Sequence, residues 1–128
     1  VTEQDLDEIF PVMALLEGRC AFEAANHATD ADLAALEILH ERLNAHAQAG
    51  QITDYYAVNF TIHEAIITLA ANRWLDRTTG DLRKFMRLMR GRQLNLPGRI
   101  ERSIAEHRVL MAAFGSGYTW AGAVMKWC

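Results

Sequence analysis

Hydrophobic residues recur every three or four positions along most of the chain, which is the spacing of one face of an α-helix. Short polar breaks separate these segments, and none shows the two-residue alternation of a half-buried strand. Helices are expected at about residues 2–25, 29–49, 53–71, 73–92 and 99–114, with a short sixth at 118–128. The pattern therefore predicts an all-α protein, an antiparallel helical bundle of about six helices.

Capping residues and helix breakers set the expected boundaries. Thr2 and Thr29 each lie three residues before an aspartate, which is the spacing of a side-chain cap at a helix start. Pro11 lies inside the first segment, where loss of a backbone donor should kink or split the helix. Asn72 is expected to cap the C-terminal end of the third helix.

Composition is typical of one globular domain covering residues 1–128, since 51% of residues are hydrophobic and 23% are charged. No apolar run approaches the ~18 residues that span a bilayer, and no secretory signal precedes the first helix. The cysteines, Cys20 and Cys128, form no disulfide or zinc motif. We therefore expect a cytoplasmic protein without a membrane association. Residues 115–128 form an atypical tail, because only Lys126 among them is charged.

Charge is distributed unevenly along the chain. Residues 1–50 hold ten acids and two bases, whereas residues 51–128 hold six acids and eleven bases. The basic excess lies within residues 73–108, where a nucleic-acid surface is one interpretation. A solvated helix face, or a partner for the acidic N-terminal helices, is the favoured one. It also leaves room for a few inward-facing arginines that meet an anionic small molecule.

Two histidines lie within apolar helix stripes. His63 follows Asn59 by four residues and shares its face with large apolar side chains, and His107 lies in the middle of the stripe of the fifth helix. A buried imidazole is costly unless it is paired. A shared metal or anion site, with Zn²⁺ or Ni²⁺ as the metal, is one interpretation; two separately satisfied core histidines are the other. The remaining histidines are expected on exposed faces or loops without a role: His27, His40 and His46.

The sequence gives little support to a self-contained enzyme. It holds no Gly-x-Ser-x-Gly motif and no Gly-rich phosphate loop. Glu64 and Glu106 adjoin His63 and His107 in sequence, but adjacent helical positions point about 100° apart. We therefore predict no catalytic residue, and keep a metal-dependent enzyme and a ligand-free interaction module as alternatives.

Several runs of residues also match a known family in order and spacing. These runs are Asp5–Gly18, Asp30–Glu37, Asn59–Ile66, Ala71–Asn72 and Ala105–Leu110. Together they resemble the FCD domain, the C-terminal effector domain of FadR-type GntR transcription regulators. The resemblance implies an antiparallel helical bundle that forms a homodimer and binds a small carboxylate or sugar acid. It also implies that DNA is contacted only through an N-terminal winged helix-turn-helix, which this chain lacks.

The same resemblance suggests a metal site. Many members of the family hold a divalent metal with one aspartate and three histidines. By the motifs above, Asn59, His63 and His107 occupy the first three positions, and the last histidine would fall just beyond Cys128. This chain departs twice from that pattern, because an asparagine amide is a weaker ligand than a carboxylate and the last histidine is missing. The expected metal site is therefore incomplete.

A third departure concerns effector recognition. Met13 stands where many members of the family carry an arginine that meets the effector carboxylate. From helix phase, we expect that role to fall to arginines of the fourth helix, Arg83 or Arg87.

Overall fold

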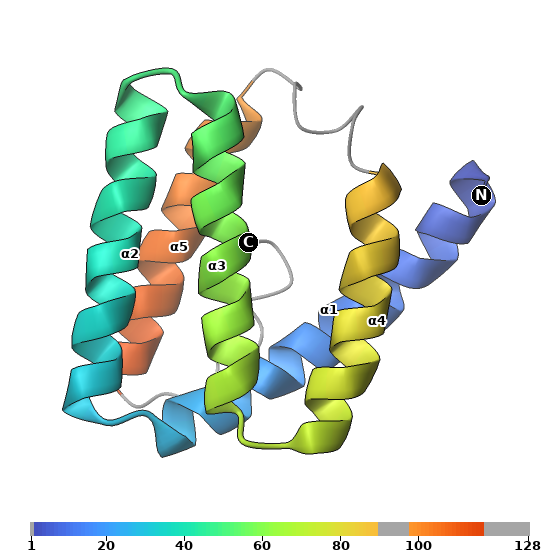
Figure 1. Ribbon diagram of the computed structural model, residues 1–128, viewed down its shortest axis with the longest axis horizontal. Helices are drawn as coiled ribbons and strands as arrows, with labels where there is room; N and C mark the ends of the chain where they lie inside the picture. Colours follow the sequence, from blue (N-terminus) through green and yellow to red (C-terminus); the bar gives the residue numbers. More distant parts are fainter. Residues whose placement is uncertain (1, 90–97, 117–128) are drawn as a thin grey trace.

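The computed structural model describes residues 2–89 and 98–116, and these residues form five α-helices (Figure 1). The helices are α1 (Glu3–His27), α2 (Asp30–Gln48), α3 (Ile52–Leu69), α4 (Arg73–Met89) and α5 (Arg99–Ser116). No strand occurs in these two described ranges, so the all-α prediction is confirmed. The count of about six helices is corrected to five, and the sixth helix predicted at 118–128 lies outside the described residues.

Side-chain caps begin the first two helices as predicted. The Thr2 hydroxyl accepts from the Asp5 backbone N–H, and the Asp5 carboxylate accepts from the Thr2 backbone N–H. Thr29 and Asp32 repeat this reciprocal pair at the start of α2. Such a box satisfies two backbone donors that the first turn leaves unpaired.

Three expected helix boundaries differ from the structure. Pro11 does not split α1, which continues through it. Proline has no N–H to donate to the Asp7 carbonyl, but Pro11 and Asp7 are both exposed, so water can take the place of this hydrogen bond. Asn72 caps the start of α4 instead of the end of α3, because its Oδ1 accepts from the backbone N–H groups of the next turn. The expected break at Gly115 is absent, since α5 continues to Ser116.

The helices pack so that α3 is central. It contacts α2, α1 and α4, while α5 packs against α2 and α1 packs against α4 (Figure 1). The main core lies between α1, α2, α3 and α5, and its largest fully buried side chains are Leu36, Leu43, Tyr55, Ile62, Ile66 and Leu110. A smaller cluster of Cys20, Ile67 and Ala70 joins α1 to α3.

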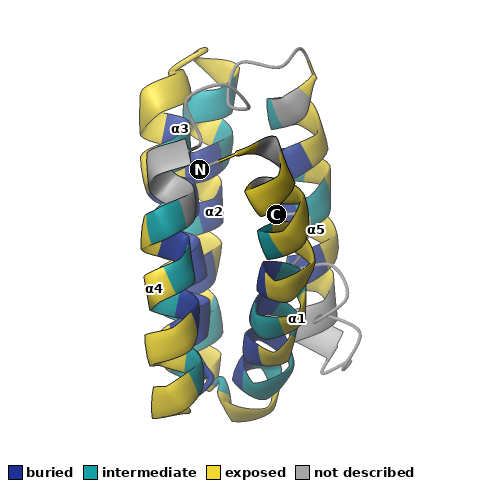
Figure 2. Cartoon of the chain, turned by 90° about the vertical axis from the view of Figure 1, so that its right-hand side faces the viewer, coloured by how far each residue is buried: buried dark blue, intermediate teal, exposed yellow. Residues whose placement is uncertain are grey.

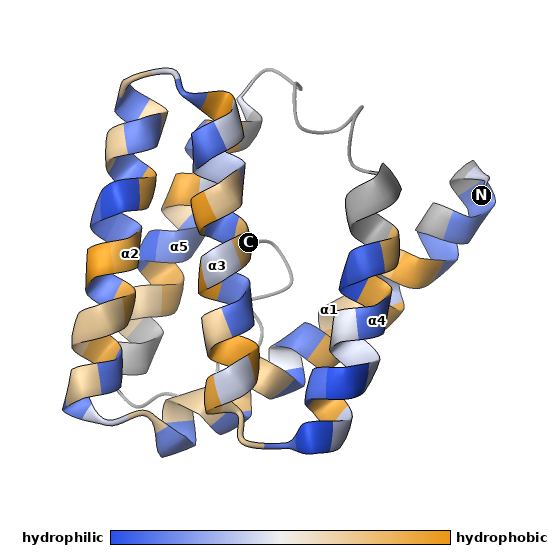
Figure 3. Cartoon of the chain, viewed as in Figure 1, coloured by the Kyte–Doolittle hydropathy of each residue, from blue (hydrophilic) through white to orange (hydrophobic). Residues whose placement is uncertain are grey.

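Burial is uneven along the two outer helices. Apart from Met13, the buried positions of α1 lie in its C-terminal half, and the N-terminal half is mostly exposed (Figure 2). Hydrophilic positions dominate α4 (Figure 3). Its bases Arg73, Arg77 and Lys84 are exposed, whereas Arg83 is buried. Most of the described basic side chains therefore lie on a solvated face, and one arginine points inward. None of the helices in the described ranges is long and apolar enough to cross a membrane.

Candidate functional site

The three residues predicted as metal ligands meet inside the bundle. Asn59 and His63 lie one turn apart on α3, and His107 approaches them from α5. The side-chain amide of Asn59 lies 2.6 Å from His107 Nε2, and the rings of His63 and His107 are perpendicular with centroids 6.1 Å apart. All three side chains are buried. Helix phase therefore predicted correctly that these side chains point inward, and Asn59 and His107 pair with each other in the described structure.

His40 continues this cluster from α2. Its Nδ1 donates to the Leu36 carbonyl at 2.7 Å, and its Nε2 lies 2.8 Å from His107 Nδ1. Burial lowers the pKa of His40, more than the hydrogen bond to Leu36 raises it. Because a neutral ring that donates through Nδ1 has an acceptor at Nε2, His107 must donate through its own Nδ1. His107 Nε2 then pairs with the Asn59 amide, through its oxygen if the ring is protonated and through its nitrogen if it is neutral.

The expectation that His40 lies on an exposed face was wrong. The residue is only 8% exposed and lies on the buried face of α2 with Leu36 and Leu43. These three residues are four and then three positions apart, and this spacing was the sequence feature that indicated a buried His40. That spacing was ambiguous, because the neighbouring Leu39 fits the same apolar stripe.

A second polar cluster lies between α1 and α4. The Arg83 guanidinium donates through Nη1 to the Glu17 carboxylate, and His63 Nδ1 lies 3.6 Å from the same oxygen, which is longer than a hydrogen bond. Glu17 is 7% exposed and Arg83 is 4% exposed. Arg83 therefore points inward, as its helix phase suggested. Arg87 lies on α4, but its side chain lies outside the described residues.

No role for Glu17 was predicted from the sequence. It lies one turn after Met13 on the buried face of α1, so an acid within an apolar stripe was the available signal. Met13 itself is buried, so an apolar side chain fills the position where an arginine was expected in relatives.

Electrostatics keep Glu17 ionised. Burial alone would raise its pKa, but His63 and Arg83 beside it outweigh that effect and lower the pKa from 4.5 to about 2. The nitrogen atoms around Glu17 have fewer hydrogen-bond partners than its carboxylate has. Arg83 Nε and Nη2, and both ring nitrogens of His63, are buried and have no hydrogen-bond partner within the described part of the chain. Buried polar atoms without partners are uncommon and costly, and they mark a place that can receive ligand atoms.

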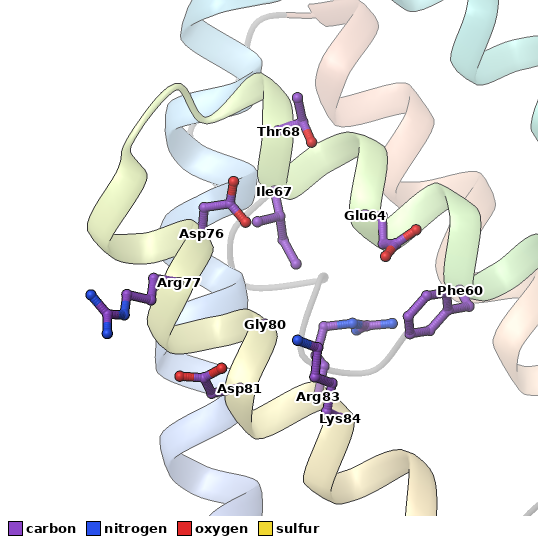
Figure 4. Close-up of a pocket in the computed structure, with 10 residues that line it drawn as sticks. All are labelled: Phe60, Glu64, Ile67, Thr68, Asp76, Arg77, Gly80, Asp81, Arg83 and Lys84. Atoms are coloured by element: carbon purple, nitrogen blue, oxygen red, sulfur yellow. The ribbon is translucent and has the colours of Figure 1, made fainter.

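A cavity of about 530 Å³ lies between α3 and α4 beside this cluster (Figure 4). Its volume is within the usual range for small-molecule sites. The Arg83 guanidinium carbon lies 5.0 Å from the centre of the Phe60 ring, and Figure 4 shows Arg83 extended toward Phe60 with Glu64 above it. Arg77 points away from the cavity in the same view. A smaller cavity of about 300 Å³ lies between α2 and α5, beside His40 and His107.

The described residues do not fit a closed metal site. No group of three or more His, Cys, Asp or Glu side chains is placed to hold a metal in residues 2–89 and 98–116. His107 uses both ring nitrogens in hydrogen bonds, and Glu17 is paired with Arg83. That leaves His63 as the unpartnered strong ligand of this cluster, whereas a closed site needs about four.

Comparison with known proteins agrees with the fold. The structure of E. coli McbR/YncC superposes on this chain with a TM-score of 0.84 at 24% sequence identity, covering 97% of this chain. This chain in turn spans 63% of that one. No curated protein sequence matches the chain. The FCD domain family matches residues 8–123, which is most of the sequence. The chain therefore belongs to the FCD domain family, as the order of its sequence motifs had indicated.

Proposed function

We propose that this chain is the effector-binding and dimerisation domain of a FadR-type GntR transcription regulator, and that its effector is a small carboxylate or sugar acid. Membership of the FCD domain family supports the regulatory role. The observation that carries the ligand assignment is the buried cluster of Arg83 and His63, which together have four nitrogens without a hydrogen-bond partner among the described residues. A carboxylate has the charge and the acceptor atoms that these groups lack.

On this proposal the domain senses a ligand and does not catalyse a reaction. The regulator acts in the cytoplasm as a homodimer, and DNA is contacted by a winged helix-turn-helix that precedes α1 in the complete protein. Glu17 of α1 forms an ion pair with Arg83 of α4, so a ligand that contacts Arg83 changes the interaction that holds α1 against α4. A ligand that binds one helix arrangement better shifts the population toward it, and α1 would transmit that shift.

On this proposal, effector binding does not require a metal. Asn59, His63 and His107 are the residues that would contact Zn²⁺ or Ni²⁺, and they are one neutral amide and two imidazoles. Since the described residues do not complete a coordination shell, we propose that effector binding does not depend on a metal.

Thermal shift measurements with the purified chain test the proposed function. The ligands are acetate, pyruvate, succinate and D-gluconate, each at constant ionic strength. We expect saturable stabilisation by at least one of them, and a weaker effect in His63→Ala and in His107→Ala. His27→Ala is the matched control, because His27 is exposed at the end of α1. Absence of a shift with every carboxylate would favour a ligand-free interaction module. Binding that neither site variant changes would show that the site is misplaced.

A further inference from the structure

The free edge of the Arg83 guanidinium is the feature that goes furthest beyond the proposed function. A guanidinium has five N–H donors, and Nε and Nη2 lie on one side of the group with their N–H bonds parallel. Glu17 uses Nη1, on the other side. Nε and Nη2 are the two nitrogens of this guanidinium that have no hydrogen-bond partner in the described part of the chain. Two parallel donors at this spacing match the two oxygens of one carboxylate.

The guanidinium is held in place before any ligand binds. Glu17 holds one end through Nη1, and the guanidinium carbon lies 5.0 Å from the centre of the Phe60 ring. Arg83 is 4% exposed, so its long side chain has little freedom left to lose. A receptor whose rotamer is already fixed loses less conformational entropy on binding, and this favours affinity.

His63 belongs to the same polar cluster. It is 1% exposed, and both of its ring nitrogens lack partners among the described residues. It lies near the same Glu17 oxygen that Arg83 contacts, so the two side chains belong to one cluster. His63 therefore lies on the Glu17 side of the guanidinium, in the same polar cluster as the free edge.

We infer that the Nε/Nη2 edge of Arg83 is a direct, metal-independent receptor for the carboxylate group of the ligand, and that Glu17 is the residue that positions it. This inference rests on the proposed function and names how its ligand is recognised. The ligand approaches from the cavity between α3 and α4. Because Nε and Nη2 are buried, Phe60 or Glu64, which lie beside the end of the guanidinium in Figure 4, must turn aside as it binds.

Glu17 and Arg83 thus have different tasks. The Glu17 carboxylate bears a negative charge that disfavours a second anion close by, so its contribution is to orient the guanidinium and not to attract the ligand. A glutamine at position 17 keeps an oxygen for Nη1 and removes that charge. An alanine removes both the oxygen and the charge. These two substitutions therefore separate orientation from electrostatics.

Isothermal titration calorimetry in the presence of EDTA tests the receptor edge. The probes are acetate, pyruvate, succinate and D-gluconate, with sulfate and inorganic phosphate as competing anions. Arg83→Lys keeps a positive charge facing Glu17 but has no fork of parallel donors. We expect it to weaken carboxylate binding by about tenfold or more, the equivalent of losing one good charge-assisted contact. Arg73→Lys is the matched control, because Arg73 is exposed on the same helix and does not line the cavity.

The positioning role of Glu17 has its own readout. Glu17→Ala should weaken binding of the same probe, and Glu17→Gln should restore it to at least the wild-type affinity. Circular dichroism melts of each variant verify that the protein is folded at the temperature of the titration. If Gln and Ala weaken binding equally in folded protein, Glu17 does not act by orienting Arg83.

Four outcomes overturn the inference in distinguishable ways. Carboxylate binding that Arg83→Lys leaves unchanged refutes the receptor edge but leaves the proposed function standing. Binding that disappears in EDTA refutes metal independence. Sulfate or phosphate that binds as tightly as the carboxylates, with the same dependence on Arg83, refutes the ligand class. If no carboxylate binds the wild-type chain with or without EDTA, the proposed function fails and the inference fails with it.

Discussion

Replacing Glu17 by glutamine should destabilise the protein by about 3 kcal/mol at neutral pH. The substitution keeps the size of the side chain and an acceptor oxygen, but it leaves the buried Arg83 charge without its counter-ion. Removing one partner of a buried ion pair costs roughly 3–5 kcal/mol. The pKa of Glu17 supports a similar magnitude, because a fall from 4.5 to about 2 corresponds to about 3 kcal/mol at 1.36 kcal/mol per pH unit. A loss of this size lowers the melting temperature by roughly 10 °C.

The effect should depend on pH in a defined direction. Since the folded-state pKa of Glu17 lies below its ordinary value, the ionised carboxylate contributes its full stabilisation above about pH 4.5. That contribution is lost as the pH falls from 4.5 toward 2. The stability difference between wild type and Glu17→Gln should therefore be constant between pH 6 and 7 and shrink below pH 4.5.

Urea unfolding monitored by circular dichroism measures this difference in the free energy of unfolding at each pH. Glu23→Gln is the matched control on the same helix, because Glu23 pairs with Arg19 at the surface, where ion pairs contribute roughly 0–1 kcal/mol. A difference below about 1 kcal/mol for Glu17→Gln at pH 7, or one that does not change with pH, would refute the assignment of a buried ion pair.

Three further predictions address the histidine cluster and the turn before α4. Asn59→Asp supplies a carboxylate next to His107, so micromolar Ni²⁺ or Zn²⁺ should raise the melting temperature of this variant more than that of wild type, reversibly with EDTA; equal shifts would contradict it. His40→Ala leaves the His107 Nδ1–H without its acceptor and should destabilise the fold by about 1–3 kcal/mol in urea unfolding, and no loss would mean that the hydrogen bond is not formed. Asn72→Ala removes the α4 cap and should cost about 1 kcal/mol, whereas the exposed Asn26→Ala should cost much less, and similar costs would argue against the cap.

The sequence predicted best what short-range chemistry decides. The caps at Thr2 and Thr29 involve residues three positions apart, so both partners are visible in the sequence. The inward direction of His63 and His107 follows from helical periodicity alone. Asn72 shows the limit of local information, because the end of α3 and the start of α4 lie within a few residues and the same asparagine could cap either.

The partners inside the bundle could not be predicted in this way. Glu17 meets Arg83 across 66 positions, and His40 meets His107 across 67. Such pairs depend on how whole helices are placed, which hydrophobic periodicity does not determine. The family resemblance supplied the expectation of a metal site at Asn59. Among the residues that the structure describes, Arg83 and His63 carry buried nitrogens without hydrogen-bond partners, and these support the proposal of a carboxylate ligand.

The most direct test of the central claim is a crystal structure of the chain with the carboxylate that binds it most tightly in calorimetry. The proposal predicts the ligand carboxylate within hydrogen-bond distance of both Arg83 Nε and Arg83 Nη2, with the rest of the molecule in the cavity between α3 and α4. A carboxylate bound instead at the exposed arginines Arg73 or Arg77, with the edge of Arg83 still free, would contradict it.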